Sequence, residues 1–266
     1  MMPLDARLMD RGMSKAGVSQ HSWALPWRPT PVGCKVPGCA RGAAARGIDR
    51  GLVTSTFTIV ATDGSDLGIG VASRVLAVGA IVPAVEIGSG AVATQAFVNV
   101  AWKGEGLRLL REGRSAAAVV EALRAPEPTP DGRQVAVVDR AGRTAAHTGS
   151  GCTPWAGHRE GPGFVVIGNI LAGERVVEAM SEAFVSSSGE LATRLVAALQ
   201  AGDRVGGDAR GRQSAAMVVE RRHGGIDGLD NRLLDLRVDD APDPVTALAQ
   251  LVSLGVAEYR TRQVEG

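Results

Sequence analysis

The chain has 266 residues, of which 45% are hydrophobic and 21% are charged, and its formal net charge is +1 at pH 7. This length and composition suit one large or two small globular domains with a real core. The near-neutral charge excludes a general attraction to nucleic acids or anionic membranes, and no apolar run reaches the roughly 20 residues that span a bilayer. We therefore expect no nucleic-acid partner and no membrane partner.

The first part of the chain lacks the periodicity of a helix or a strand. Pro, Gly, Arg and Ala dominate residues 1–51, as in PWRPTPVGCKVPGCARGAAARG. Such a segment cannot bury enough apolar surface to offset the entropy that it would lose on ordering. We predict that residues 1–53 are a disordered leader outside the mature protein, and that a single domain spans residues 54–266.

Three interpretations of this leader compete. An Arg-rich, acid-poor segment suits a transit-type peptide, although this one is neither amphipathic nor Ser-rich. Cys34 and Cys39 could begin a zinc knuckle, but His21 alone cannot complete the ligand set. The third interpretation, which we favour, places the true start codon at Val53, because the periodic sequence begins immediately after it.

The number and positions of the cysteines indicate the cellular compartment of the protein. Two of the three cysteines lie in the leader, and the body keeps only Cys152. The sequence thus offers no disulfide framework, and residues 1–50 contain no secretory signal. We therefore expect a cytoplasmic protein.

The body opens with the alternating segment TFTIVAT (residues 56–62), which has hydroxyl-bearing side chains on one face and apolar side chains on the other. The turn signal DGSD and the segment LGIGVAS (67–73) complete an antiparallel hairpin. Ser115 suits a helix N-cap, and Gly113 suits a helix stop. In the same half of the body, apolar segments predict strands at 80–87 and 90–95, and we predict helices at 104–112 and 115–124.

The second half repeats this alternation of strands and helix pairs. It predicts strands at 133–139, 143–149, 163–169, 213–221 and 232–238, and helices at 173–185, 188–201 and 243–259. A Rossmann fold needs one helix between successive parallel strands, so this order excludes it. The order favours an α+β fold with two antiparallel sheets face to face and helices covering the outside.

Common catalytic and cofactor motifs are missing from the sequence. It contains no P-loop and no G-x-S-x-G nucleophile elbow, and its glycine-rich segments GIGVAS and GSGAVA suit closely packed strands better than a nucleotide site. His147, Cys152 and His158 do not match a common zinc pattern, which favours a structured loop anchored by Trp155. We therefore expect neither a metal nor a cofactor.

Polar residues stand at the ends of two otherwise apolar strands. Thr94, Gln95 and Asn99 fall in ATQAFVN, and Asn169 ends GFVVIGN. Polar groups that emerge from a buried strand must be satisfied by backbone or by ligand. Asn169 could donate a side-chain N–H to an oxyanion, and a structural amide is the alternative.

The most unusual stretch is GGDARGRQSAAMVVE (206–220), a Gly-rich turn that leads into a strand. Its backbone N–H groups and the guanidinium groups of Arg210 and Arg212 could bind a carboxylate. The alternative is a surface turn held by an Asp–Arg pair. The residues of interest here are Asp208, Arg210, Gln213 and Ser214.

Seven segments in this order resemble the family called domain of unknown function 1028: TFTIVATD, LGIGVASRVLAVGAIVP, GSGAVATQAFVN, VAVVDRAGRTAAHTGSGCTPWAGH, GNILAG, GGDARGRQSAA and NRLLDLRVDDAPDPVTAL. The resemblance covers about residues 56–260. It implies a four-layer αββα sandwich like that of the N-terminal nucleophile hydrolases. In those enzymes the first residue of the mature chain attacks an amide carbonyl, and its own α-amine accepts the proton.

By this resemblance, the chain is expected to hydrolyse small amide or peptide-like compounds. Thr56 would be the nucleophile, Asn169 or the region of Thr94 and Gln95 would bind the oxyanion, and Arg74 would tune the nucleophile. Four residues would line the substrate end, namely Asp208, Arg210, Gln213 and Ser214. The alternative is a non-catalytic, ligand-binding or structural member of the same fold. Folds of this kind often assemble, so we also expect a homo-oligomer.

Two features depart from the family pattern. Thr56 follows Ser55, rather than an initiator methionine or the glycine usual at self-cleaving junctions. The family's VDD-His-PDP segment reads VDDAPDP here, so Ala241 stands in place of the histidine.

Overall fold

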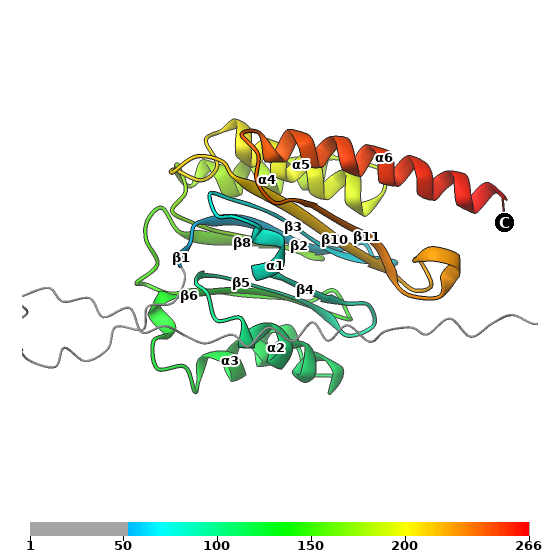
Figure 1. The fold of residues 1–266 in the computed structure, drawn as a ribbon. Coiled ribbons are helices and arrows are strands. Elements are labelled where there is room, and N and C mark those ends of the chain that lie inside the picture. Colours follow the sequence, from blue (N-terminus) through cyan, green and yellow to red (C-terminus); the bar gives the residue numbers. More distant parts are fainter. Residues whose placement is uncertain (1–52, 266) are drawn as a thin grey trace, which may run out of the picture. The chain divides into compact units, whose positions relative to one another are not determined.

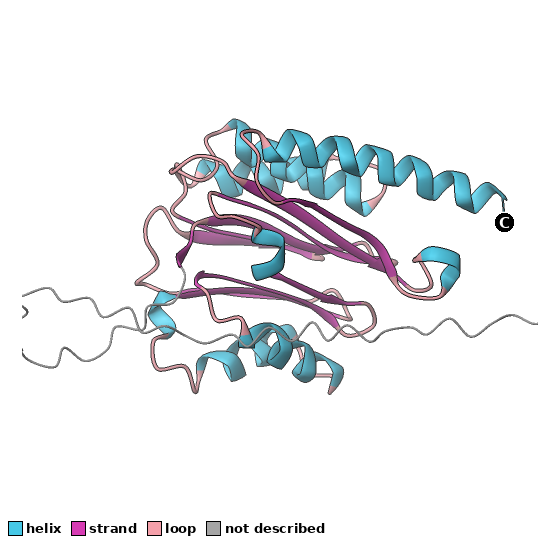
Figure 2. Ribbon diagram, viewed as in Figure 1, coloured by secondary structure: helices cyan, strands magenta, loops and turns pink. Residues whose placement is uncertain are grey.

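The structure, a computed structural model, describes residues 53–265, so the predicted leader lies outside the described residues except for Val53. Within this range, two antiparallel sheets lie face to face, with helices on their outer surfaces (Figures 1 and 2). The arrangement is the α+β sandwich that the order of elements predicts.

The first sheet, here called the six-stranded sheet, has the order β11-β10-β3-β2-β9-β8. Its strands β2 and β3 form the predicted hairpin, and β9 pairs with the other side of β2. Strand β2 therefore lies inside this sheet, with a neighbour on each side. The strands are β2 (Thr56–Thr62), β3 (Asp66–Ser73), β8 (Gly157–Gly161), β9 (Phe164–Asn169), β10 (Ser214–Arg221) and β11 (Arg232–Val238).

The second sheet, here called the five-stranded sheet, has the order β1-β5-β6-β7, and β4 also pairs with β5. Strands β1 and β4 share one edge of β5, because β6 occupies the other edge. The chain therefore passes from one sheet to the other between β1 and β2. The strands are β1 (Val53–Thr54), β4 (Pro83–Glu86), β5 (Gly90–Phe97), β6 (Arg133–Asp139) and β7 (Thr144–Thr148).

Helices cover both outer faces (Figure 1). Helices α4 (Arg175–Ser186), α5 (Leu191–Arg204) and α6 (Pro244–Glu265) pack on the six-stranded sheet, and α2 (Ala101–Arg111) and α3 (Ala116–Arg124) pack on the five-stranded sheet. Three apolar clusters result, one under each helix layer and one between the sheets. None of the helices in the described range is long and apolar enough to cross a bilayer.

Glycines in β3 explain how closely α5 approaches the sheet. A Cβ atom at Gly68 would lie 2.9 Å from Leu195 Cδ1, and one at Gly70 would lie 3.1 Å from Leu199 Cδ1. The segment GIGVAS is therefore a glycine-rich strand that packs tightly against a neighbour, as the sequence suggests.

Local differences from the predicted elements have identifiable causes. The strand expected at 80–87 begins instead as a helical turn, α1 (Val78–Ile81), and only Pro83–Glu86 is extended. The turn starts at Ala77, whose φ is 53°, and it is fixed by a hydrogen bond from the Val78 N–H to Ser214 Oγ. Strand β8 falls partly in the predicted loop, because its exposed polar residues form an edge strand without an alternating pattern.

Candidate active site

Three buried hydroxyl and amide side chains meet at one end of the six-stranded sheet. Thr56 is the first residue of β2, and the antiparallel register places it opposite Ser73 of β3 and Asn169 of β9. All three are at most 2% exposed. The sequence predicts Thr56 and Asn169 as site residues, and the pairing of the strands brings them side by side.

Ser73 connects the Thr56 hydroxyl with the peptide that precedes Thr56. The Thr56 hydroxyl donates to Ser73 Oγ at 3.3 Å, and the Ser73 hydroxyl donates to the carbonyl oxygen of Ser55 in a short hydrogen bond. Sequence reasoning missed Ser73, although it is the last residue of the predicted second strand. The predicted hairpin could have indicated Ser73, because its last residue lies opposite its first residue, Thr56.

Residues Val53–Ser55 fill the space beside Thr56. Thr54 pairs with Ala96 of the five-stranded sheet, and Ser55 joins β1 to β2 of the six-stranded sheet. The Ser55 hydroxyl lies 3.3 Å from the carbonyl oxygens of both Asn169 and Ile170, and the residue is fully buried. This segment therefore occupies the position next to the Thr56 nitrogen, which is an amide nitrogen in the full chain.

Backbone strain surrounds this crossing. Ala96 has a φ of 65° and Ile170 a φ of 51°, both in the left-handed region that side chains with a Cβ seldom adopt. Such residues cost about 1–3 kcal/mol each and cluster at functional sites. Ala96 pairs with Thr54, and Ile170 accepts from Ser55, so both strained residues contact the segment that precedes Thr56.

A network of buried amides from the five-stranded sheet supports Thr56 from the other side. Gln95 Nε2 donates to the Thr56 carbonyl at 3.0 Å and to Gln134 Oε1 at 2.7 Å, while the Thr58 hydroxyl donates to Gln95 Oε1 at 2.6 Å. Asn169 Nδ2 also donates to Gln134 Oε1, at 3.2 Å. Gln134 thus joins Gln95 and Asn169, which are both predicted site residues. The sequence could have indicated Gln134, because it is a polar amide inside the otherwise apolar strand RQVAVVD.

Two buried polar side-chain atoms, one on β9 and one on β5, lack a partner. Asn169 Oδ1 and Thr94 Oγ1 make no hydrogen bond to any residue that the structure describes. Buried polar atoms are nearly always satisfied, and exceptions call for an explanation such as a catalytic role. Thr94 lies on the opposite face of β5 from Gln95, on the side of Val92 and Val135 that packs under α2 and α3. Of these two atoms, only Asn169 Oδ1 therefore leaves polar capacity beside Thr56, and the predicted role of Thr94 in the site is not supported by its position.

Beyond the ends of β3 and β10 lies a small cavity of about 300 Å³. Arg74 Nη1 donates to Gln213 Oε1 at 2.9 Å, and Gln213 Nε2 donates to Asp240 Oδ1 at 3.2 Å. Neither Arg74 nor Asp240 has an oppositely charged partner among the described residues. The cavity is lined by Arg74, Arg212, Gln213, Asp240, Ala241 and Pro242.

The predicted glycine-rich turn is held together largely by its own side chains. Asp208, whose side chain is 1% exposed, accepts from the backbone N–H groups of Arg74 and Arg210 and pairs with the Arg210 guanidinium at 3.4 Å. Arg212 pairs with Asp203 at 2.7 Å. The Ser214 hydroxyl donates to the Val75 carbonyl and accepts from Val78. In the described chain, Asp208 and Ser214 thus position the backbone around Arg74.

Asn99 does not join the residues around Thr56. Its Nδ2 donates to Glu127 Oε2 at 3.0 Å, and Glu127 also pairs with Arg133 at 3.0 Å. Its Oδ1 accepts from the N–H of Ala101, the first residue of α2. Asn99 therefore holds the start of a helix to the following loop.

The histidines and the cysteine of HTGSGCTPWAGH form no metal site. Within the described range, no group of His, Cys, Asp and Glu could hold a metal ion. His158 Nδ1 hydrogen bonds with Thr148 Oγ1 at 2.9 Å, and burial lowers the pKa of His158. Burial also raises the pKa of the Cys152 thiol, which makes it a poor nucleophile near neutral pH. Trp155 packs against the cluster under α4 and α5.

Comparisons with known proteins agree with this architecture. A family model described as "Family of unknown function (DUF1028)" matches residues 56–248. The chain also resembles the crystal structure of a protein from Silicibacter pomeroyi that carries the same family model, with 32% identity and a TM-score of 0.69 over 75% of this chain and 85% of that one. No curated protein is similar enough to count as a match. The chain therefore belongs to the family of unknown function DUF1028.

Proposed function

We propose that this protein hydrolyses small amide or peptide-like compounds, with Thr56 as an N-terminal nucleophile. The observation that carries the proposal is the position of the Thr56 hydroxyl, which lies at a buried polar junction of both sheets and bonds to Ser73. The family model also begins at Thr56. This position suits the fold of the N-terminal nucleophile hydrolases, to which we assign the chain as part of the proposal.

The chemistry requires a free α-amine on Thr56, and hence a chain without residues 1–55. An α-amino group has a pKa of about 7.7–8.0, so a useful fraction is neutral near pH 7. The neutral amine takes the proton of the Thr56 hydroxyl as Oγ1 attacks the substrate carbonyl. The departing amine takes that proton when the C–N bond breaks, and water then hydrolyses the Thr56 ester and restores the hydroxyl.

Removal of residues up to Ser55 would also leave space beside Thr56 for the acyl group of the substrate. Ser55 now contacts Ser73, Asn169 and Ile170, so these residues would face the substrate in its place. The second hydrogen of Asn169 Nδ2 would stabilise the oxyanion, while Gln95 Nε2 holds the Thr56 carbonyl. Ser73 would hold the nucleophile and its amine together.

The charged residues next to this site favour substrates that carry an α-amino acid group. The Gln213 amide lies between the Arg74 guanidinium and the Asp240 carboxylate. Such a pair of opposite charges suits the carboxylate and the ammonium of one amino acid. The guanidinium of Arg74 bonds to Gln213 and makes no described bond to Thr56, so we assign it to the substrate carboxylate rather than to the nucleophile.

The test compares a chain that begins Met-Thr56, from which the methionine is removed, with the full chain. We expect the shortened chain to hydrolyse side-chain amides of α-amino acids in preference to simple amides such as acetamide. Thr56→Ala should lower kcat/KM on the order of 10³-fold or more, because the nucleophile is lost, while Thr56→Ser should keep part of the activity. Intact mass confirms the free threonine, and the melting curve checks the fold.

Two outcomes would contradict the proposal. Turnover by the Thr56→Ala variant at the rate of its parent would exclude the nucleophile. Saturable binding of amino acids without turnover of any amide would favour a ligand-binding member of the fold instead.

A further inference from the structure

A second cavity lies at the end of β2 opposite Thr56. It has a volume of about 680 Å³, and Thr62, the last residue of β2, lines it. The seven residues of β2 separate it from Thr56 by about 20 Å, given the rise of about 3.3 Å per residue in a strand. The cavity is therefore distinct from the proposed active site.

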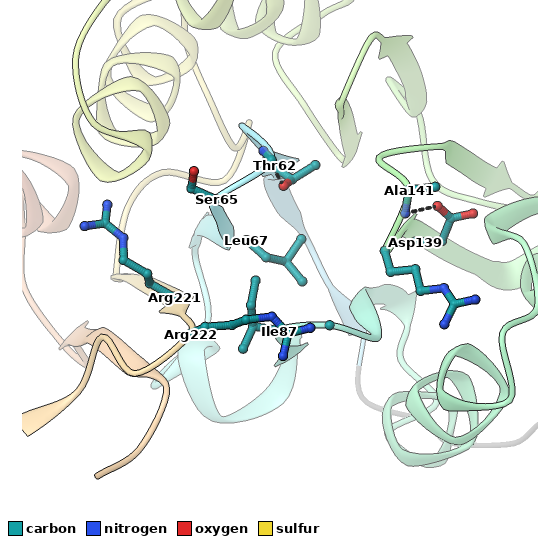
Figure 3. Close-up of a pocket in the computed structure, with 11 residues that line it drawn as sticks. Thr62, Ser65, Leu67, Ile87, Asp139, Ala141, Arg221 and Arg222 are labelled. Atoms are coloured by element: carbon teal, nitrogen blue, oxygen red, sulfur yellow. Dashed lines mark hydrogen bonds between the residues drawn. The ribbon is translucent and has the colours of Figure 1, made fainter. Parts of the chain in front are cut away.

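Residues of both sheets line this cavity (Figure 3). Thr62, Leu67 and Arg221 belong to the six-stranded sheet, while Asp139 ends β6 of the five-stranded sheet. The full lining comprises Thr62, Gly64, Ser65, Leu67, Ile87, Gly88, Asp139, Arg140, Ala141, Arg221 and Arg222. A ligand in this cavity would therefore touch both layers of the sandwich.

The carboxylates at this cavity are fully engaged by the protein. Asp139 is buried and accepts from the backbone N–H groups of Ala116 and Ala141 at 3.0 and 2.9 Å, and from Arg143 Nε at 2.7 Å. Burial by itself would raise the pKa of Asp139, but these hydrogen bonds outweigh it, so the pKa lies below its usual value. Asp66, behind Arg221, accepts from Nε and Nη2 of that guanidinium.

Two arginines at the cavity remain without such a partner. Arg140 and Arg222 are exposed, and neither has a hydrogen bond or an ion pair with any residue in the described range. The Arg222 guanidinium lies against the turn at Gly88, where a Cβ atom would be only 2.6 Å from its Nη2. Arg140 reaches toward the turn at Gly113, at 3.6 Å from the corresponding Cβ position. Their two positive charges are thus available to a ligand.

We propose that this cavity binds a small dianion, a phosphate monoester or a dicarboxylate, between Arg140 and Arg222. Guanidinium groups pair strongly with phosphate and carboxylate oxygens. The volume falls in the usual range for small-molecule sites of about 300–1,000 Å³. The Ser65 hydroxyl adds a polar group, and Leu67 and Ile87 add apolar surface for the rest of the ligand.

Calorimetry and thermal melting of the full chain test this site in a phosphate-free buffer of low ionic strength. The probes are inorganic phosphate, glycerol 2-phosphate and succinate. We expect one saturable site and a rise in Tm of a few degrees, because the ligand binds only the folded state. Arg140→Gln and Arg222→Gln should each weaken binding about tenfold or more. Thr56→Ala should bind as the parent does, so this result does not depend on the proposed hydrolase activity.

The matched control is Arg204→Gln, which removes an exposed arginine at the end of α5, away from the cavity lining. Binding should be unchanged in this variant. Saturation by the two phosphates but not by succinate identifies a phosphate site, and the reverse identifies a dicarboxylate site. The proposal is overturned if none of the probes binds at concentrations up to about 10 mM, or if Arg204→Gln weakens binding as much as the two cavity variants.

Discussion

At the scale of single residues, the Gln134 side chain connects several strands of both sheets. Its Oε1 accepts from Gln95 and Asn169, and its Nε2 lies 2.8 Å from the Gly168 carbonyl and 3.1 Å from the Gly157 carbonyl. It thereby links β6 with its neighbour β5 in one sheet and with β8 and β9 in the other. A buried amide with this many partners specifies how the two sheets face each other.

Gln134→Leu should therefore destabilise the protein by about 2–3 kcal/mol, because the side-chain amides of Gln95 and Asn169 and the Gly168 carbonyl each lose a hydrogen bond inside the buried network. Urea unfolding measures the change. Gln250→Leu, at an exposed position of α6, is the matched control and should change the free energy of unfolding by less than about 0.5 kcal/mol. An equal effect of the two substitutions would show that the amide network contributes nothing to stability.

At the scale of elements, the contact between β3 and α5 depends on two glycines of β3, Gly68 and Gly70. Gly68 leaves room for Leu195, and a Cβ there would also lie 3.0 Å from the Val218 carbonyl. The glycines weaken the intrinsic preference of β3 for a strand, but they let a helix with bulky leucines approach closely. Packing of the neighbouring helix therefore outweighs strand propensity in this element.

Gly68→Ala is expected to cost about 1–3 kcal/mol, because the added methyl group overpacks a filled contact. Gly104→Ala provides the comparison, since a Cβ atom at this position of α2 would meet nothing within 4 Å. It should stabilise the protein by about 0.5–1 kcal/mol through the higher helix propensity of alanine. Thermal melts of the two variants should thus shift in opposite directions, and a parallel shift would refute the packing argument.

At the scale of the whole molecule, three apolar clusters share the strands of two sheets. Ile69 of β3 is fully buried between the sheets, while the neighbouring glycines of the same strand face α5. Each strand therefore contributes to the cluster between the sheets and to a cluster under the helices. This sharing couples the layers, so that the sandwich should unfold in one step.

Ile69→Ala should lower the free energy of unfolding by about 2–5 kcal/mol, since it removes a fully buried side chain from the layer between the sheets. Far-ultraviolet and near-ultraviolet circular dichroism should still report the same single transition. Leu229→Ala, at a residue that is 86% exposed, should leave stability within about 0.5 kcal/mol of the parent. Two separate transitions in the Ile69→Ala variant would show that the layers unfold independently.

Part of the site could be predicted from the sequence, and part could not. Gln95 and Asn169 stood out as polar residues at the ends of apolar strands, and Thr56 was predicted from the family resemblance. The structure brings the three together. Ser73 and Gln134 escaped notice, since their role depends on which strands become neighbours. Asn99 and Arg210 carry the same kinds of polar group, but their bonds to Glu127 and Asp208 direct them elsewhere.

The sequence by itself determined the order of strands and helix pairs, and hence the sandwich, because alternation and helical periodicity are local properties of the chain. Only the tertiary structure decided the register that sets Thr56 between Ser73 and Asn169, and the crossing of Val53–Ser55 from one sheet to the other. Likewise, the cavity with Arg140 and Arg222 joins segments that are about 80 residues apart in the chain. Contacts of this kind depend on the packing of distant segments, which no local pattern encodes.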